Sequence, residues 1–221
     1  MPEISIVVPT FSEAENIAEL HSRLSNALGA ESWEIIFVDD DSPDGTADLA
    51  RALATKDPRV RCIQRIGRRG LSTAVVEGAL SSSAPFVAVM DADLQHDEAV
   101  LPAMLSELRS RDLDVVVGSR YIAGGGTGDW DEGRRQISRI ASRLARGLVP
   151  ETLADPMSGF FVMKSQALRD AAHQLSGYGY KILLDLFVSA PQPLVAIGEQ
   201  VVEKEVGCHR AHGAGELRCG E

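Results

Sequence analysis

The sequence lacks the features that mark several protein classes. Its three cysteines, Cys62, Cys208 and Cys219, form no CxxC pair, which favours reduced thiols over a disulfide framework. Apolar runs such as residues 85–90 are far shorter than the roughly 18 residues that a membrane-spanning helix needs. No basic leader precedes the first apolar segment, so we expect no signal peptide and a cytoplasmic protein.

Positive charge is also scarce. The chain has 22 lysines and arginines against 32 aspartates and glutamates, which gives a net charge of -10. A general nucleic-acid-binding protein needs a basic footprint, so we expect no nucleic acid partner. Hydrophobic residues make up 44% and charged residues 24% of the 221 positions, as in ordinary globular proteins, and this length fits one domain with a sizeable core.

Strand and helix patterns alternate over the first 120 residues. Predicted strands span residues 4–8, 34–38, 60–64, 86–90 and 114–117. One helix is predicted directly after a Ser12-x-x-Glu15 capping box. Three more are predicted over residues 46–53, 72–80 and 98–109. This alternation predicts an α/β fold with a mostly parallel sheet and helices on both faces. Neither a G-x-x-x-x-G-K-[ST] loop nor a G-x-G-x-x-G turn follows a predicted strand, which argues against P-loop and dinucleotide-dehydrogenase classes.

Acidic residues follow the fourth predicted strand. Parallel sheets bind their ligands outside the carboxyl ends of the strands. Asp91 and Asp93 are two residues apart on chain that we expect to be extended, so both carboxylates can point to the same side. Paired carboxylates suit Mg²⁺ or Mn²⁺ shared with substrate phosphates, and Gln95 offers a further carbonyl oxygen. The alternative is that these aspartates only solvate the end of a strand.

A second acidic cluster follows the second predicted strand. Asp39 and Asp40 are candidates for binding the polar groups of a ribose or a base; the alternative is a turn and helix-capping role, which we assign mainly to Asp44. Glu13 has a similar alternative, because acids near a helix start favour the helix dipole. Arg120 follows the fifth predicted strand and is a candidate for holding a diphosphate, with a surface ion pair as its alternative.

A basic helix is predicted over residues 134–149. Apolar residues recur there at helical spacing, and no acid interrupts them. Five arginines are interleaved with them: Arg134, Arg135, Arg139, Arg143 and Arg146. In a chain of net charge -10, this concentration favours contact with an anionic membrane surface or a lipid phosphate. The alternative is a core-packed helix with a solvated basic face.

Seven motifs occur in one order along the chain. They are VPTFSEAEN (8–16), VDDDSPDGT (38–46), GLSTA (70–74), MDADLQH (90–96), GSRY (118–121), Trp130 with Arg134 and Ser138, and DPMSGFF (155–161). With them the chain resembles the dolichyl- or polyprenyl-phosphate glycosyltransferases of GT-A family 2. The resemblance covers about residues 4–195. It implies a GT-A, Rossmann-like domain over residues 1–205, with residues 206–221 as an atypical and poorly ordered tail.

The resemblance also implies roles for individual residues. Phe11 stands where the family usually has tyrosine, so base stacking is kept while a hydroxyl contact is lost. The implied nucleotide site contains Pro9, Phe11, Glu13 and Asp39, to which we add Asp40 from the second acidic cluster. The implied metal and diphosphate site, for Mg²⁺ or Mn²⁺, contains Asp91, Asp93 and Gln95, with Arg120 steadying the diphosphate. The implied acceptor side contains Arg134 and Ser138, which would receive a lipid phosphate, and Asp155.

The activity that the resemblance implies is metal-dependent transfer of a sugar from a nucleotide donor to dolichyl or polyprenyl phosphate at the cytoplasmic membrane face. Mannose from GDP-mannose is the first expectation, and UDP-glucose is the alternative donor. An acceptor phosphate is already ionised at neutral pH, so a single inverting displacement needs no strong base. A sugar-phosphate nucleotidyltransferase would instead need a glycine-rich loop and a basic residue after the first strand, and residues 9–12 offer neither. A third alternative is a glycosyltransferase-like binding module without turnover.

The C-terminal tail departs from the family pattern. After about residue 195, relatives continue with a strand and then F-x-x-R-x-x-G-x-S-K-L, whose basic residues help to bind the acceptor phosphate. If Gly215 keeps the glycine of this motif, His212 replaces its arginine and Leu217 its serine. A mostly neutral imidazole does not match a guanidinium on phosphate. We therefore expect an intact donor half of the site and an impaired acceptor half.

Overall fold

The computed structural model describes residues 1–29, 31–119, 158–177, 181–192, 194 and 197–201. They form a seven-stranded sheet of order β3-β2-β1-β4-β6-β5-β7. In chain order the strands are β1 (Ile4–Thr10), β2 (Trp33–Asp39), β3 (Val60–Gln64), β4 (Phe86–Val89), β5 (Val115–Ser119), β6 (Phe161–Lys164) and β7 (Ile197–Val201). Strand β6 pairs antiparallel with β4 and β5, and the other pairs are parallel. The predicted mostly parallel α/β sheet is confirmed.

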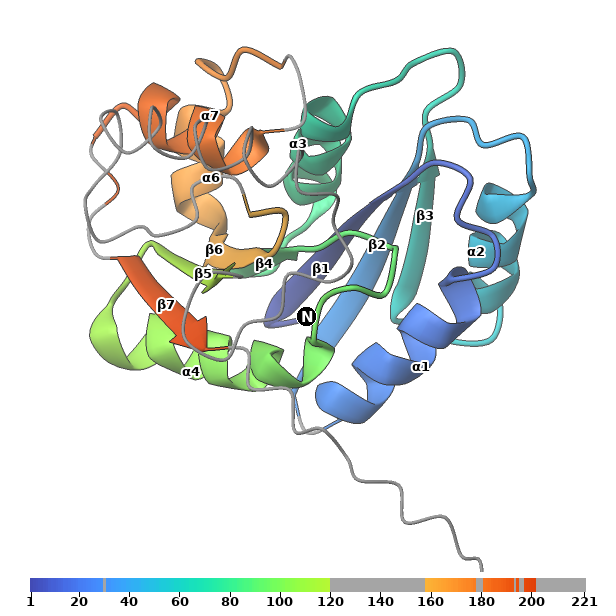
Figure 1. Ribbon diagram of the computed structural model, residues 1–221, viewed down its shortest axis with the longest axis horizontal. Helices are drawn as coiled ribbons and strands as arrows, with labels where there is room; N and C mark the ends of the chain where they lie inside the picture. The colour runs from blue at the N-terminus through green and yellow to red at the C-terminus, as the bar shows by residue number, and fades with distance from the viewer. Residues whose placement is uncertain (30, 120–157, 178–180, 193, 195–196, 202–221) are drawn as a thin grey trace, which may run out of the picture.

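Helices cover both faces of this sheet (Figure 1). They are α1 (Ile17–Ala27), α2 (Thr46–Ala54), α3 (Leu71–Ser81), α4 (Leu101–Arg111), α6 (Ser165–Ala171) and α7 (Ile182–Ser189), with a short 3-10 helix η1 (Glu98–Val100) before α4. Along β1, the side chains of Ile6 and Val8 pack in one apolar cluster with α1, α2 and α4. Val7 packs in the opposite cluster with α3, α6 and α7. Because both faces are buried, β1 is apolar along nearly its whole length.

Helix α3 lies very close to the sheet at Gly78. A Cβ atom added at this glycine would lie 2.5 Å from Cγ1 of Val7 and 2.8 Å from Cγ2 of Val38. Real carbon atoms do not approach so closely, so glycine lets α3 pack directly on β1 and β2. The following residue, Ala79, is also small and buried.

Helix α1 begins later than the predicted capping box, so that prediction is wrong. Ser12 has a φ of 60°, and its backbone N–H donates to Oγ of Ser42 at 3.0 Å. The N–H groups of the next two residues donate to Oγ1 of Thr46 and Oδ2 of Asp44. Side chains of the turn before α2 and of its first residue thus accept the N–H groups of residues 12–14. Residues 11–16 are therefore a loop held against that turn.

The predicted helix over 98–109 begins with η1 and continues as α4. Asp97 caps η1, because its Oδ1 accepts the N–H of Ala99 at 3.0 Å. None of the helices in the described ranges is both long and apolar enough to span a bilayer. The predicted basic helix over 134–149 and the tail over 206–221 lie outside the described residues.

Candidate active site

The candidate site lies at the carboxyl edge of the parallel strands. Parallel register places Asp39 at the end of β2 beside Thr10 at the end of β1. Val89, the last residue of β4, pairs with Val7 of β1, and Asp91 follows two residues later. Both predicted acidic clusters therefore leave the sheet at the same edge.

Asp39 is fully buried and bound within the chain. Its Oδ1 accepts the hydroxyls of Thr10 at 3.2 Å and Ser42 at 2.5 Å, and its Oδ2 accepts the N–H of Ser42 at 2.9 Å. These bonds hold the turn after β2 against the end of β1. The turn-stabilising role is present, and contact of Asp39 with a nucleotide stays a prediction.

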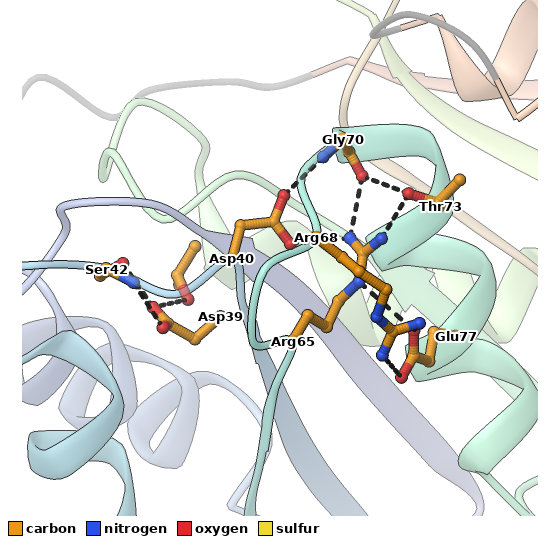
Figure 2. Close-up of polar contacts among 9 residues, drawn as sticks. Asp39, Asp40, Ser42, Arg65, Arg68, Gly70, Thr73 and Glu77 are labelled. Carbon is orange, nitrogen blue, oxygen red and sulfur yellow. Dashed lines mark hydrogen bonds and ion pairs between the residues drawn. The ribbon is translucent and has the colours of Figure 1, made fainter.

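Asp40 forms a buried ion pair with Arg65 (Figure 2). Nη1 of Arg65 lies 2.7 Å from Oδ1 of Asp40, and the backbone N–H of Gly70 donates to Oδ2 at 2.7 Å. Arg65 is only 3% exposed, and it also donates to the carbonyl of Gly70 and to Oγ1 of Thr73. Each oxygen of Asp40 thus has a partner within the chain.

Sequence reasoning placed Arg65 only in a basic loop and missed this pair. A usable signal was present, because Asp39 of β2 and Gln64 of β3 are register partners. Asp40 directly follows β2 and Arg65 directly follows β3, so opposite charges come just after two neighbouring strand ends.

The loop after β1 presents an exposed aromatic ring. Phe11 is 42% exposed, and the guanidinium of Arg69 lies 4.1 Å from its ring centroid. Pro9 is half-buried at the strand end, and Oε2 of Glu13 accepts Nδ2 of Asn16 at 2.7 Å. A shallow hollow beside this loop is lined by residues 12–16 and Asp44.

Asp44 fixes the start of α2, as predicted. Its Oδ1 accepts both the N–H and the hydroxyl of Thr46, at 3.1 and 2.6 Å. The hydroxyl bond from Thr46 holds the pKa of Asp44 below its usual value. Because Oδ2 also accepts the N–H of Ala14, Asp44 ties the loop after β1 to α2.

The chain around Asp91 and Asp93 is bent and not extended, so that part of the prediction is wrong. Pairing of β4 ends at Val89, and Leu94 has a φ of 60°. Oδ1 of Asp93 accepts the N–H of Gln95 at 3.1 Å, which closes a turn where extended chain was expected. Asp93 and Gln95 are exposed on this turn.

Asp91 lies against the segment that precedes β6. A Cβ atom added at Gly159 would lie 2.6 Å from Oδ2 of Asp91. His96 stacks on Phe160 with 5.0 Å between ring centroids, and its Nε2 lies 3.5 Å from the same Asp91 oxygen. The side chain of Asp91 remains 38% exposed, so it is oriented by its neighbours and still open to a ligand.

The residues of this turn fit a divalent cation shared with a ligand. Within the described part of the chain, no group of three or more His, Cys, Asp or Glu side chains is arranged to hold a metal. Mg²⁺ usually takes only one or two carboxylates together with phosphate oxygens and water. Asp91 and Asp93, with the amide oxygen of Gln95, match that oxygen-only requirement.

The predicted acceptor residues Arg134, Ser138 and Asp155 lie outside the described residues. Arg120, predicted to steady the donor diphosphate, lies outside them as well. The end of the last motif is described: Oγ of Ser158 donates to the carbonyl of Gly118 at 2.9 Å. The geometry above therefore concerns the predicted nucleotide and metal residues.

Comparison with known proteins gives relatives over most of the chain. It is 38% identical over 188 residues to a dolichol-phosphate mannosyltransferase of Pyrococcus furiosus, covering 84% of this chain and 52% of that protein. It is 39% identical over 206 residues to one of Saccharomyces cerevisiae, covering 89% of this chain and 75% of that protein. The chain thus spans about half the length of the archaeal relative and three quarters of the yeast one.

Solved structures share the fold. Glucosyl-3-phosphoglycerate synthase from Mycobacterium tuberculosis, in complex with Mn²⁺, UDP and glucosyl-3-phosphoglycerate, matches with a TM-score of 0.65 and 23% identity, over 90% of this chain and 69% of that one. This likeness shows the GT-A fold. The family described as Glycosyl transferase family 2 matches residues 5–171. The chain belongs to glycosyl transferase family 2.

Proposed function

We propose that this chain is a metal-dependent, inverting glycosyltransferase that moves mannose from GDP-mannose to dolichyl or polyprenyl phosphate. One observation carries the proposal. The segments that bear Asp91, Phe11 and Arg69 all leave the sheet at its carboxyl edge, where Arg69 lies over the ring of Phe11. Relatives named dolichol-phosphate mannosyltransferase support mannose as the sugar and dolichyl phosphate as the acceptor.

The donor is held by residues at the ends of β1, β2 and β4. Phe11 stacks on the base, and Pro9, Glu13 and Asp39 shape the pocket around the nucleoside. Asp91, Asp93 and Gln95 would hold a divalent ion, Mg²⁺ or Mn²⁺, and such an ion would supply positive charge to the leaving diphosphate. The mycobacterial synthase, which shares the fold, binds Mn²⁺ and UDP, and this supports the use of a divalent metal with the nucleotide.

The acceptor side of the proposed site is assigned from the family motifs. Arg134 and Ser138 receive the lipid phosphate, Asp155 belongs to the acceptor-side motif, and Arg120 steadies the donor diphosphate. An acceptor phosphate oxygen attacks the anomeric carbon from the side opposite the leaving diphosphate, which inverts the configuration. The phosphate is already ionised, so catalysis depends on positioning two anions and neutralising the leaving group.

The proposed location is the cytoplasmic face of a membrane. Residues 1–205 form the catalytic domain in this proposal, and the basic segment over 134–149 contacts anionic lipid. Each basic side chain near such a surface contributes about 1 kcal/mol, enough for five arginines to hold a domain of net negative charge.

A donor screen tests the proposed reaction. Release of nucleoside diphosphate is measured with GDP-mannose and UDP-glucose, with Mg²⁺ or Mn²⁺ and a short polyprenyl phosphate. We expect slow release from GDP-mannose that depends on both metal and acceptor, because the tail departs from the family's acceptor motif. Release from UDP-glucose alone would favour the alternative donor, which is supported by the mycobacterial synthase crystallised with UDP-glucose. Release from neither donor would contradict the proposal.

The binding-module alternative rests on the tail. The family arginine and serine are replaced there by His212 and Leu217, if Gly215 keeps the register. A chain that binds GDP and metal but transfers mannose only after the family motif is restored from residue 196 onward would favour the module. Efficient transfer by the chain as it stands would exclude it.

A further inference from the structure

The Asp40–Arg65 pair fixes both ends of one loop. This loop, residues 65–70, joins β3 to α3 and begins with a backbone bond from the N–H of Arg65 to the carbonyl of Asp39 at 2.8 Å. At its far end, Gly70 is held through both backbone polar groups: its N–H by Asp40 and its carbonyl by Arg65, at 2.7 and 3.0 Å. Figure 2 shows these side chains converging on Gly70 from two strand ends.

The held position is one that few residues adopt. Gly70 has a φ of 140°, a backbone conformation that side chains disfavour. Thr73 braces it from α3, because its hydroxyl donates to the carbonyl of Gly70 at 2.8 Å. Glu77 of the same helix lies 3.3 Å from Nε of Arg65 and 2.9 Å from Nη1 of Arg68. The loop therefore leaves the sheet along one defined path.

The residue that this path places is Arg69. It directly precedes Gly70, and its guanidinium lies over the exposed ring of Phe11, which belongs to a different loop. Ile66, near the start of the same loop, is 75% exposed, so apolar packing does not anchor the outer part of the loop. Polar contacts hold this loop instead, and those of Gly70 with Asp40 and Arg65 lie next to Arg69.

A buried ion pair is weak evidence for a role in stability. Apolar side chains of similar volume often hold two elements together as well or better, and the best-attested use of buried charge is to select one arrangement. Here the selected arrangement contains a planar cation facing an aromatic ring. Such a pair is a suitable wall for the flat base of a nucleotide.

We infer that Asp40 and Arg65 are positioning residues, which set Arg69 over Phe11 and so shape the base side of the donor site without touching the nucleotide. This inference rests on the proposed function, in that it takes Phe11 to stack on the base. It replaces direct contact of Asp40 with the nucleotide, because Asp40 is only 7% exposed and each of its oxygens already accepts a bond.

A double-mutant cycle on nucleotide affinity separates the two roles. Binding of GDP and UDP with Mg²⁺ is measured by calorimetry for the full chain and for Asp40→Asn, Arg69→Ala and the double variant. We expect Asp40→Asn to weaken binding about tenfold, because it releases Arg69. The double variant should then be no weaker than Asp40→Asn alone, since both changes remove one interaction.

Asp57→Asn is the matched control. Asp57 pairs with Arg59 at 2.7 Å, between α2 and β3 at the opposite end of the sheet. This variant removes the same charge from an aspartate that also pairs with an arginine, here a more exposed one, and with His21. Thermal unfolding of both variants reports the cost to the fold. Nucleotide affinity should be unchanged in Asp57→Asn. If Asp40→Asn does not fold, Arg65→Lys keeps the charge but loses the fork that reaches both Asp40 and Thr73.

Three results would overturn the inference. Multiplicative losses in the double variant would mean that Asp40 acts independently of Arg69. Unchanged affinity in a folded Asp40→Asn or Arg65→Lys variant would remove the positioning role. An original chain that binds neither GDP nor UDP would overturn the proposed function together with this inference, and so differs from the first two results.

Discussion

At the scale of single residues, the carboxylates near the turn at Asp91 differ in burial and in their hydrogen bonds. Asp93 is exposed and forms a turn bond, whereas Glu98 is buried at the start of η1. Oε1 of Glu98 has no hydrogen-bond partner among the described residues, and burial raises the pKa of this carboxyl. The folded chain therefore disfavours the ionised form of Glu98.

This pKa shift predicts a pH-dependent effect of Glu98→Gln. A carboxyl whose folded pKa is raised favours the folded state below its unfolded pKa of about 4.3, and this contribution is lost as the pH rises through the folded pKa. The free energy of unfolding of Glu98→Gln minus that of the original chain should thus increase between pH 4 and pH 7. Urea denaturation across this range measures it. A difference that stays constant or falls would contradict the burial argument.

Gly159 is a position at which even one added carbon atom would collide with a neighbouring side chain. A Cβ atom there would lie 2.6 Å from Oδ2 of Asp91, so Gly159→Ala must displace that carboxylate. We expect Mn²⁺ affinity in the presence of GDP, measured by electron paramagnetic resonance, to fall about tenfold, because one oxygen ligand is misplaced. GDP affinity without metal is the control and should change little. Unchanged Mn²⁺ affinity would remove Asp91 from the metal site.

At the scale of elements, the contact of α3 with the sheet gives a stability prediction. Gly78→Ala gains helix propensity of about 1 kcal/mol but inserts a methyl group into contacts of 2.5 and 2.8 Å. Overpacking typically costs about 1–3 kcal/mol, so we expect a net loss of stability. Chemical denaturation measures it, with Leu80→Ala at the exposed end of α3 as control. A stabilised Gly78→Ala variant would mean that α3 moves freely from the sheet.

Local sequence patterns predicted a helix or strand well where the residues that determine its two ends are close to it in the sequence. The strand over residues 60–64 matches β3, and the helix over 46–53 is one residue shorter than α2. The predicted start of α1 was wrong, because the acceptors for the N–H groups of residues 12–14 are side chains about 30 residues later in the sequence. Long-range acceptors of this kind leave no mark on local periodicity.

The candidate site was predictable in part for the same reason. Positions after strand ends identified Asp39 and Asp91, since the edge of a parallel sheet follows from the strand pattern. The contacts that orient these side chains were not predictable, because Gly159 reaches Asp91 only through the pairing of β6 with β4. The strand β6 itself lies between β4 and β5 although it follows both in sequence, an order that alternation does not encode.

At the scale of the whole molecule, net charge and local charge disagree. The chain carries -10 overall, yet five arginines and no acid lie within residues 134–149. We predict that the chain sediments with anionic liposomes and that Arg139→Glu with Arg143→Glu weakens this binding, because both changes place negative charge near the lipid. Sedimentation should also fall as salt rises. Equal sedimentation of the double variant would favour the core-packed interpretation of this segment.

The late insertion of β6 between β4 and β5 has a consequence for synthesis on the ribosome. Strands β1 to β4 can pair as soon as residue 89 has emerged, but one side of β4 then stays an open strand edge until residues 161–164 follow. Domains fold from the N-terminus as they emerge, and unpaired apolar edges are where nascent chains associate wrongly. A ribosome that stalls anywhere between these two points therefore leaves a β4 edge made of Phe86, Val87, Ala88 and Val89 unpaired, and a chaperone that covers this edge would prevent wrong association.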